Sequence, residues 1–329
     1  MPPDERKAYR IIYDGLKMRS FNIVIALPLS QDEVQEIYLR VLYDNPLFYY
    51  VNQTIIKMQG MFGYWTLLPE YLYTNREISI INTDIRAIIN RVRTKAESFG
   101  NDEFRLEKCL HDSVVKSVAY DYDSLKKQDS FNAHSIVGAF LDKRAVCEGI
   151  AKAFKLLCNE FGIKCIVVLG KANENGNFDN DDYHAWNLVK IRDESYYVDV
   201  TWDNMYDGDL RHISYDYFNV TTKDIMLDHQ PISDLPECTS TRLNYFYCTK
   251  SFVSTYGELE KLINDRLASK QIIFKALKNK GEFMSLEELE RKTCNALAKA
   301  MAGKYDTRAF ALVFNKMHNI GKIFFMPQV

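Results

Sequence analysis

The chain has 329 residues, 47% of them hydrophobic, and its 42 basic and 44 acidic residues leave a formal net charge of −2. That length predicts one large or two modest domains, and the balanced charge gives no reason to expect a nucleic acid or an anionic membrane as partner. No segment approaches the run of about 18 apolar residues that a membrane span needs. Residues 1–10 carry no signal-peptide pattern, so we expect a cytoplasmic location.

Residues 1–82 are predicted to form an N-terminal α+β segment. Ser30 and Glu33 have the spacing of a capping box, which predicts that a helix begins there. Residues 47–53 and 61–71 are short, apolar and aromatic, which is typical of strands.

Residues 83–255 are predicted to form the core. Four helices are expected, the first with Thr83 as its N-cap and the last beginning at Cys147; they cover 83–100, 103–121, 132–145 and 147–161. The pattern then changes to that of strands, at 163–170, 184–191 and 195–202, with a two-residue loop at Arg192 and Asp193 joining the last two.

Residues 256–329 are predicted to form a mainly helical C-terminal segment. The apolar residues follow a helical spacing over three stretches, at 256–270, 286–303 and 307–319, and residues 322–327 are typical of a last short strand.

The seven cysteines form neither a disulfide framework nor a zinc site by their spacing. Their number is odd and no C-x-x-C pair occurs, so we expect at least one free thiol. The acidic run 179–182 is predicted to be a solvated loop, and no calcium-loop pattern is present. We therefore expect no metal and no cofactor.

Cys147, His184 and Asp199 form a possible catalytic triad. A thiol nucleophile needs a base to make it a thiolate, and the base needs a third group to hold its tautomer and stabilise its positive charge. At the start of a helix, Cys147 would lie where backbone N–H groups and the helix dipole favour a thiolate and could receive an oxyanion. Lys143 and Arg144 add positive charge there, and Glu148 partly opposes it.

The predicted hairpin also brings the other two residues together. With a two-residue loop, His184 and Asp199 fall on the same face of neighbouring strands and their side chains can meet. An aspartate among apolar strand residues is unusual, so we expect Asp199 to have a charged or donor partner. We expect Asp199 to accept from the Nδ1–H of His184.

Each of these residues also has a purely structural interpretation. A single cysteine at the start of a helix is most often a packing residue, since an unpaired cysteine behaves as a small hydrophobe. A single histidine in a strand is most often a structural residue with its hydrogen bonds satisfied. Cys158 and Cys165 fit the apolar faces of their helix and strand, and we interpret them as core.

Three sequence blocks favour the catalytic interpretation over the structural one. RAVCEGIAKAF, HAWNLVKI and YYVDVTWD occur in order and at fitting spacings. Together they resemble the transglutaminase-like superfamily, in its bacterial, papain-like branch, over roughly residues 105–205. The resemblance implies an α+β fold with a papain-like core, in which N-terminal helices pack on an antiparallel sheet, here with additional N- and C-terminal α+β segments.

The resemblance also implies roles for individual residues. Cys147 would be the nucleophile, His184 the general base and acid, and Asp199 the group that orients His184. Four further residues match positions that shape the substrate pocket or support the oxyanion: Trp186, Asn187, Trp202 and Asp203. His134 departs from the pattern, because an aromatic residue is more usual at that position.

We therefore expect a thiol-dependent acyl-transfer enzyme that acts on the amide bonds of a protein or peptide substrate through an acyl-enzyme. Hydrolysis, as in a cysteine protease, is the favoured reaction because water is always present, while transglutamination or deamidation stay open. The alternative is a catalytically inactive transglutaminase-like binding or scaffolding module. The sequence makes no prediction of oligomeric state.

Overall fold

The computed structural model describes residues 1–53, 56–126, 130–179, 183–207, 210–277, 285–304 and 308–326. Helices and strands are mixed throughout, as the predicted α+β class requires. The chain divides into two compact units, the first made of residues 1–168 and 185–190, the second of residues 169–184 and 191–329. None of the helices in the described part of the chain is long and apolar enough to span a bilayer.

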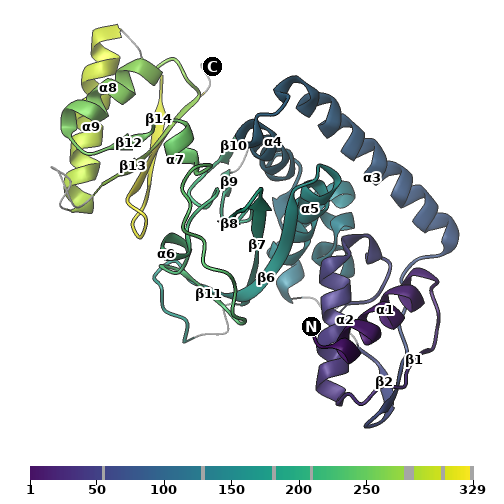
Figure 1. The fold of residues 1–329 in the computed structure, drawn as a ribbon. Helices are drawn as coiled ribbons and strands as arrows, with labels where there is room; N and C mark the ends of the chain where they lie inside the picture. Colours follow the sequence, from purple (N-terminus) through teal and green to yellow (C-terminus); the bar gives the residue numbers. More distant parts are fainter. Residues whose placement is uncertain are drawn as a thin grey trace. The chain divides into compact units, whose positions relative to one another are not determined.

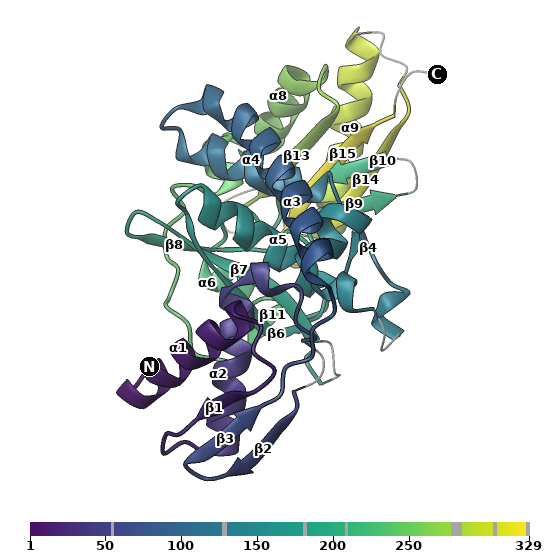
Figure 2. The ribbon, with the colours of Figure 1, turned by 90° about the vertical axis from the view of Figure 1, so that its right-hand side faces the viewer.

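The first unit begins with two helices and a small sheet (Figure 2). The elements are α1 (Pro3–Lys17), β1 (Ile23–Ile25), α2 (Gln31–Asp44), β2 (Met58–Met61) and β3 (Tyr64–Leu67), and the strand order is β1-β3-β2. Ser30 and Glu33 form the predicted capping box at the start of α2. The predicted strand at 47–53 is wrong: a short 3-10 turn begins at Pro46, and Tyr49 and Tyr50 are buried in the core instead of lining a sheet.

The long helix α3 (Asn75–Ala96) follows (Figure 1). The prediction that Thr83 caps this helix is wrong, because Thr74 is the N-cap and forms a capping box with Glu77. The Thr83 hydroxyl instead donates to the carbonyl of Ser79, one turn earlier within the helix. The predicted boundary at residue 82 thus falls inside α3, and the division into three segments stays a prediction.

The helices that follow carry the candidate nucleophile. α4 (Glu103–Val115) begins where predicted, but the helix predicted over 103–121 is too long, because it ends at Val115 and residues 119–120 form a strand. The helix expected at 132–145 is broken into a 3-10 turn at 131–134, a π-helical turn at 138–142 and the two-residue strand β5 (Arg144–Ala145). The break is sterically fixed at Gly138, where an added Cβ would lie 2.4 Å from the Asn132 carbonyl oxygen. β5 pairs in parallel with β4 (Ala119–Tyr120) and leads directly into the next helix.

Helix α5 (Cys147–Glu160) begins at Cys147, as predicted. Eleven of its fourteen residues are buried, so the helix lies inside the first unit and is not an amphipathic surface helix. Gly149 in its first turn permits this burial, because a Cβ there would lie 2.4 Å from the carbonyl oxygen of Ala133.

A four-stranded sheet follows α5 in the chain. Its strands are β6 (Lys164–Ala172), β7 (Tyr183–Ile191), β8 (Glu194–Val198) and β11 (His229–Pro231), in the order β11-β6-β7-β8. The two-residue loop at Arg192 and Asp193 is confirmed, and Arg192 has the positive φ of 53° that such a tight turn needs. β8 ends at Val198, so the strand predicted over 195–202 is too long. Residues 180–182 of the acidic run lie outside the described residues.

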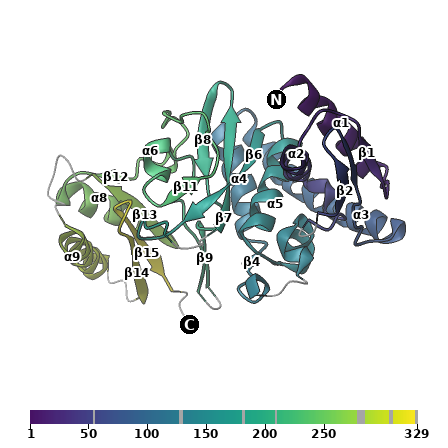
Figure 3. The ribbon, with the colours of Figure 1, turned by 90° about the horizontal axis from the view of Figure 1, so that it is seen from below.

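The second unit ends in a sheet covered on one face by two helices (Figure 3). The elements are β12 (Phe252–Val253), α8 (Tyr256–Arg266), β13 (Gln271–Ala276), α9 (Leu286–Lys304), β14 (Phe310–Asn315) and β15 (Ile320–Phe325), with strand order β12-β13-β15-β14. The helix predicted over 307–319 is wrong, because β14 pairs with β15 from Phe310 to Asn315.

Among its described residues, the second unit also contains four short elements: β9 (Asn204–Asp207), β10 (Leu210–Ile213), α6 (Thr222–Ile225) and α7 (Tyr245–Cys248). β9 and β10 form an antiparallel pair of their own.

Candidate active site

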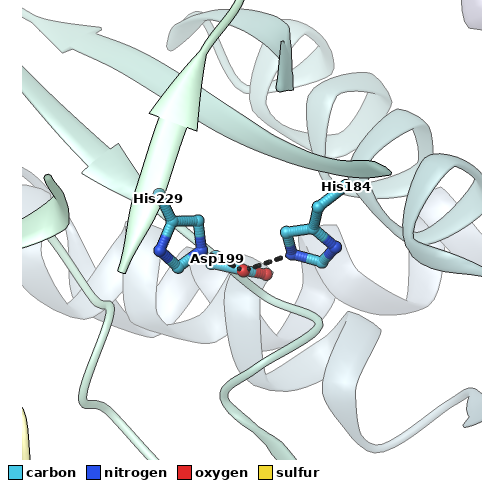
Figure 4. Close-up of side chains that lie close together, drawn as sticks. All are labelled: His184, Asp199 and His229. Atoms are coloured by element: carbon cyan, nitrogen blue, oxygen red, sulfur yellow. Dashed lines mark hydrogen bonds and ion pairs between the residues drawn. The ribbon is translucent and has the colours of Figure 1, made fainter. Parts of the chain in front are cut away.

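The carboxylate of Asp199 is a buried junction of four hydrogen bonds. Its Oδ2 lies 2.6 Å from Nε2 of His184 and 3.0 Å from Nε2 of His229 (Figure 4). Its Oδ1 accepts from the backbone N–H groups of Thr201, at 2.8 Å, and Trp202, at 3.1 Å. Because Asp199 stands directly after β8, the turn that follows folds its N–H groups back onto the carboxylate. The expected donor partner of Asp199 is confirmed.

The hydrogen bond to His184 uses a different ring nitrogen from the one predicted. We expected Asp199 to accept from Nδ1–H, but the nitrogen that faces the carboxylate is Nε2. Nδ1 of His184 is therefore the ring nitrogen that does not face Asp199. The indole of Trp202 packs against the ring of His184, with centroids 5.6 Å apart, and restricts its rotation.

Both imidazoles stabilise the ionised form of Asp199. Burial is the largest influence and by itself raises the pKa of this carboxyl. The charges and hydrogen bonds of His184 and His229 outweigh it and hold the pKa of Asp199 well below its usual range. A carboxylate that stays ionised over the working pH range is what a histidine needs to carry a transient positive charge.

Sequence analysis did not identify His229 as a site residue. It is the first residue of β11, 30 positions beyond Asp199, and is fully buried. The centroid of its ring lies 4.5 Å from that of the Trp202 indole and 5.6 Å from that of the His184 ring. No pattern links His229 to the motif blocks, because β11 reaches the site by pairing with β6, which is distant in sequence.

Cys147 belongs to the first unit, where it is the first residue of α5 and 9% exposed. Its neighbour Val146 is the N-cap and provides no side-chain cap, so no side chain at that position accepts from the N–H groups of the first turn. The phenol of Tyr120 lies beside the thiol. Burial raises the pKa of Tyr120, and the charge and hydrogen bond of the Cys147 thiol raise it further.

The charges around the thiol are already paired with other groups. Glu148, expected to oppose a thiolate, accepts from Lys152 at 2.5 Å and lies 2.9 Å from Nδ1 of His134. Arg144, expected to favour a thiolate, lies 3.2 Å from a carboxylate oxygen of Asp121. Because Glu148 and Arg144 are each paired, their electrostatic effect on the Cys147 thiol is reduced. The backbone N–H groups at the start of α5 are then a main electrostatic influence on the thiol.

The N-terminal segment supports this cluster. Lys152 is buried, donates to the side-chain oxygen of Gln53, and places its ammonium 4.5 Å from the ring centroid of Tyr43 on α2. Residues 1–82 therefore contribute contacts to the helix that carries Cys147.

The ion pair of Glu148 predicts a specific loss of stability in acid. Burial by itself raises the pKa of Glu148, but Lys152 and His134 outweigh it and lower the value to about 2. A lowered pKa contributes stability that is complete above the ordinary glutamate pKa of about 4.3 and is lost as the pH falls toward 2. We expect Glu148→Gln to lower the melting temperature at neutral pH by several degrees. The difference in melting temperature from the wild type should become smaller as the pH falls below about 4.

Melting curves of the wild type and Glu148→Gln over this pH range measure the effect. Glu33→Gln is the matched control, because Glu33 caps a helix and is exposed to solvent. A difference between wild type and Glu148→Gln that stays constant as the pH falls would contradict the assignment.

The four predicted supporting residues occupy different positions. Trp186 is fully buried. The amide nitrogen of Asn187 donates to the carbonyls of Ala151, at 3.0 Å, and Ile166, at 3.2 Å, and so ties α5 to β6. Trp202 contacts both imidazoles, as described above. Asp203 is buried and accepts from the N–H of Tyr217.

His184, Asp199 and His229 also have the donor atoms of a metal site. Two ligands about 2.0–2.1 Å from a tetrahedral zinc ion lie roughly 3.3 Å apart. The carboxylate oxygen lies 2.6 and 3.0 Å from the two nitrogens, which are hydrogen-bond distances. The arrangement is therefore that of donors bound directly to a carboxylate.

Comparison with known proteins agrees with the sequence motifs. Residues 91–202 match the family model of the transglutaminase-like superfamily, which confirms the resemblance for this part of the chain. The match contains Cys147, His184 and Asp199 within its limits. No curated protein matches the sequence.

Solved structures show weaker similarity. A structure described as that of a TGase has 15% identity and a TM-score of 0.34, over 60% of this chain and 54% of that one. A protein provisionally described as a cysteine protease, from Cytophaga hutchinsonii, has 16% identity and a TM-score of 0.26, over 45% and 61%. Menin, in a structure that reveals its binding site for the Mixed Lineage Leukemia protein, has 13% identity and a TM-score of 0.28, over 93% and 53%. This chain thus spans little more than half of each of these chains.

Proposed function

We propose that this chain is a thiol-dependent acyl-transfer enzyme that cleaves amide bonds in a protein or peptide substrate. The observation that carries the proposal is the buried hydrogen bond of 2.6 Å between His184 and Asp199, within a region that matches the transglutaminase-like family. Cys147, which lies within the same matched range, is the first residue of α5, where no side chain caps the helix. In this proposal Cys147 is the nucleophile, His184 the base and acid, and Asp199 the orienting group.

The proposed reaction has two half-reactions. Nδ1 of His184 takes the thiol proton of Cys147, and the sulfur attacks the amide carbonyl carbon. The backbone N–H of Cys147 donates to the oxyanion that forms. The C–N bond then breaks, His184 returns its proton to the leaving amine, and a thioester to Cys147 remains.

Water completes the second half-reaction in the version that we favour. His184 removes a proton from water, the hydroxide adds to the thioester, and the carboxylic acid leaves as the thiol is restored. An amine in place of water would give transamidation, and water acting on a glutamine side chain would give deamidation. Water needs no acceptor site of its own, which is why hydrolysis is preferred.

We expect Cys147 to be the most reactive of the seven thiols at neutral pH. Iodoacetamide at limiting amounts, followed by peptide mapping, measures this directly. The comparison is stringent because Cys147 is buried whereas Cys248 and Cys294 are exposed. Labelling that followed exposure alone would modify the two exposed thiols first.

Two controls complete the thiol experiment. His184→Ala should slow labelling at Cys147 and leave labelling at Cys248 unchanged, and unfolded protein should label all seven thiols at similar rates. Preferential labelling of Cys248 or Cys294 in the wild type would favour the inactive binding module. Peptide and glutamine-donor libraries, each with and without an added amine, then separate hydrolysis, deamidation and transamidation, with Cys147→Ala as the inactive reference.

A further inference from the structure

The imidazole of His229 lies between two buried carboxylates. Its Nε2 is 3.0 Å from Oδ2 of Asp199, and its Nδ1 is 2.7 Å from Oδ1 of Asp228. The side chains of His229 and Asp199 are fully buried, and that of Asp228 is almost so. Both ring nitrogens therefore face an oxygen that water does not screen.

This geometry determines how many protons the ring carries. An ionised carboxylate can only accept hydrogen bonds, and a neutral imidazole has one donor and one acceptor nitrogen. A neutral ring would turn a lone pair toward one of the two oxygens at hydrogen-bond distance. If both carboxylates are ionised, both nitrogens must donate, and the ring of His229 is a positively charged imidazolium.

Both carboxyls favour the ionised form. The pKa of Asp199 is held well below its usual range, as described above. Burial by itself raises the pKa of Asp228, but hydrogen bonds from His229 and His318 and their charges outweigh it and lower the value to about 2. A buried cation between two buried anions is the arrangement that offsets their desolvation.

A second layer of contacts holds Asp228 in turn. Its Oδ2 accepts from the hydroxyl of Tyr217 at 2.7 Å and faces Nε2 of His318 at 2.8 Å. His318 lies in the turn between β14 and β15, where its backbone N–H donates to Asn315 at 3.2 Å. The chain of contacts thus runs from His184 through Asp199, His229 and Asp228 to the C-terminal hairpin.

We propose that His229 is a positioning residue for the His184–Asp199 pair, held as an imidazolium by Asp228 and through it by the β14–β15 hairpin. This rests on the proposed function, since it assigns His229 a task at the same site. The cation holds the carboxylate of Asp199 through the same oxygen, Oδ2, that faces His184. It also shares the negative charge of Asp199, which makes His184 a weaker base and a better proton donor to a leaving amine.

The groups that face His229 define what a substitution would change. They are Asp199 and Asp228 at its two nitrogens, with the rings of His184, Trp202 and Tyr217 packed around it. In His229→Gln one amide can still donate to a carboxylate, but the positive charge is lost. Asp199 would then act on His184 with its full charge, and the titration midpoint of His184 should rise by about one pH unit or more.

Nitrogen-15 NMR of the histidine-labelled full chain tests the proposal. In the wild type, both ring nitrogens of His229 should give the signals of an imidazolium at neutral pH. His229→Gln should raise the titration midpoint of His184, whereas the control His212→Gln, at a ring that stacks on Phe324, should not. A neutral His229 ring in the wild type would overturn the proposal, and this measurement needs no variant to fold.

The same samples separate this inference from the proposed function. Labelling of Cys147 in the wild type reports on the function, and the protonation of His229 reports on the positioning network. An imidazolium at His229 together with an unreactive Cys147 would support the hydrogen-bonded network but contradict the proposed enzymatic function. If both hold, the alkaline limb of the pH–rate profile should move upward in His229→Gln. A uniform fall in rate at every pH, with no shift of the alkaline limb, would show that His229 has only a structural role and would overturn the proposal.

Discussion

Replacing Asp199 with asparagine is expected to lower turnover per folded molecule by about one to three orders of magnitude. In the proposed mechanism, the carboxylate orients His184 through Nε2 and stabilises the imidazolium that would form when Cys147 ionises. The corresponding loss in a serine triad is about four orders. A smaller loss is expected here, because a thiol depends less on its base than a hydroxyl does.

The surroundings of Asp199 predict that the same substitution also lowers stability. The asparagine oxygen could still accept from the N–H groups of Thr201 and Trp202, but its amide nitrogen would then face the N–H groups of His184 and His229. Hydrogen-bond donors would then face donors in a buried site, so at least one ring must turn or lose a proton.

A melting curve and a rate on the same purified variant separate these two effects. The rate is divided by the folded fraction, and Cys147→Ala gives the background. Trp202→Phe is a useful comparison, because it alters the packing around His184 and leaves the carboxylate in place. A normal rate per folded molecule in Asp199→Asn would show that Asp199 is not part of the proposed triad, which would then be at most a dyad of Cys147 and His184.

Local sequence signals predicted the elements that carry the proposed triad. The start of α5 at Cys147 follows from an apolar helical stripe, and the hairpin of β7 and β8 follows from two strand patterns separated by two residues. The contact between His184 and Asp199 agrees with the predicted hairpin, although Asp199 stands one residue beyond the end of β8. Each of these inferences needs residues that are close in sequence.

The features that sequence analysis missed depend on distant contacts or on competing patterns. His229 reaches Asp199 because β11 pairs with β6, and no local pattern encodes that pairing. Asp228 and His318 meet across 90 residues. The error at β14 has another origin: the run from Phe310 to Phe314 is apolar without a clear period, and its pairing with β15 decides in favour of a strand.

Lys322→Met is expected to destabilise the second unit by about 3–5 kcal/mol, a large part of the stability of an ordinary domain. Lys322 lies on β15 and is buried, and its ammonium is 2.7 Å from Oδ2 of Asp216, which is also buried. Burial by itself raises the pKa of Asp216, but the charge and hydrogen bond of Lys322 outweigh it and lower the pKa. Removing the lysine would leave an uncompensated carboxylate in the interior.

The test compares this variant with two others in urea-unfolding and melting experiments. The double variant Asp216→Asn with Lys322→Met should be more stable than Lys322→Met alone, because no buried charge then lacks a partner. Lys275→Met is the matched control: Lys275 pairs with Asp224 at 2.9 Å from the neighbouring strand β13, but both side chains are partly exposed, so the loss should be about 1 kcal/mol or less. Equal losses in the Lys322 and Lys275 variants at neutral pH would contradict the interpretation of Lys322 and Asp216 as a buried ion pair.

The effect of Lys322→Met should also depend on pH. Because the pKa of Asp216 is lowered, its ion pair contributes stability above the ordinary aspartate pKa of about 3.9. The difference in free energy of unfolding between the wild type and Lys322→Met should therefore become smaller as the pH falls below that value.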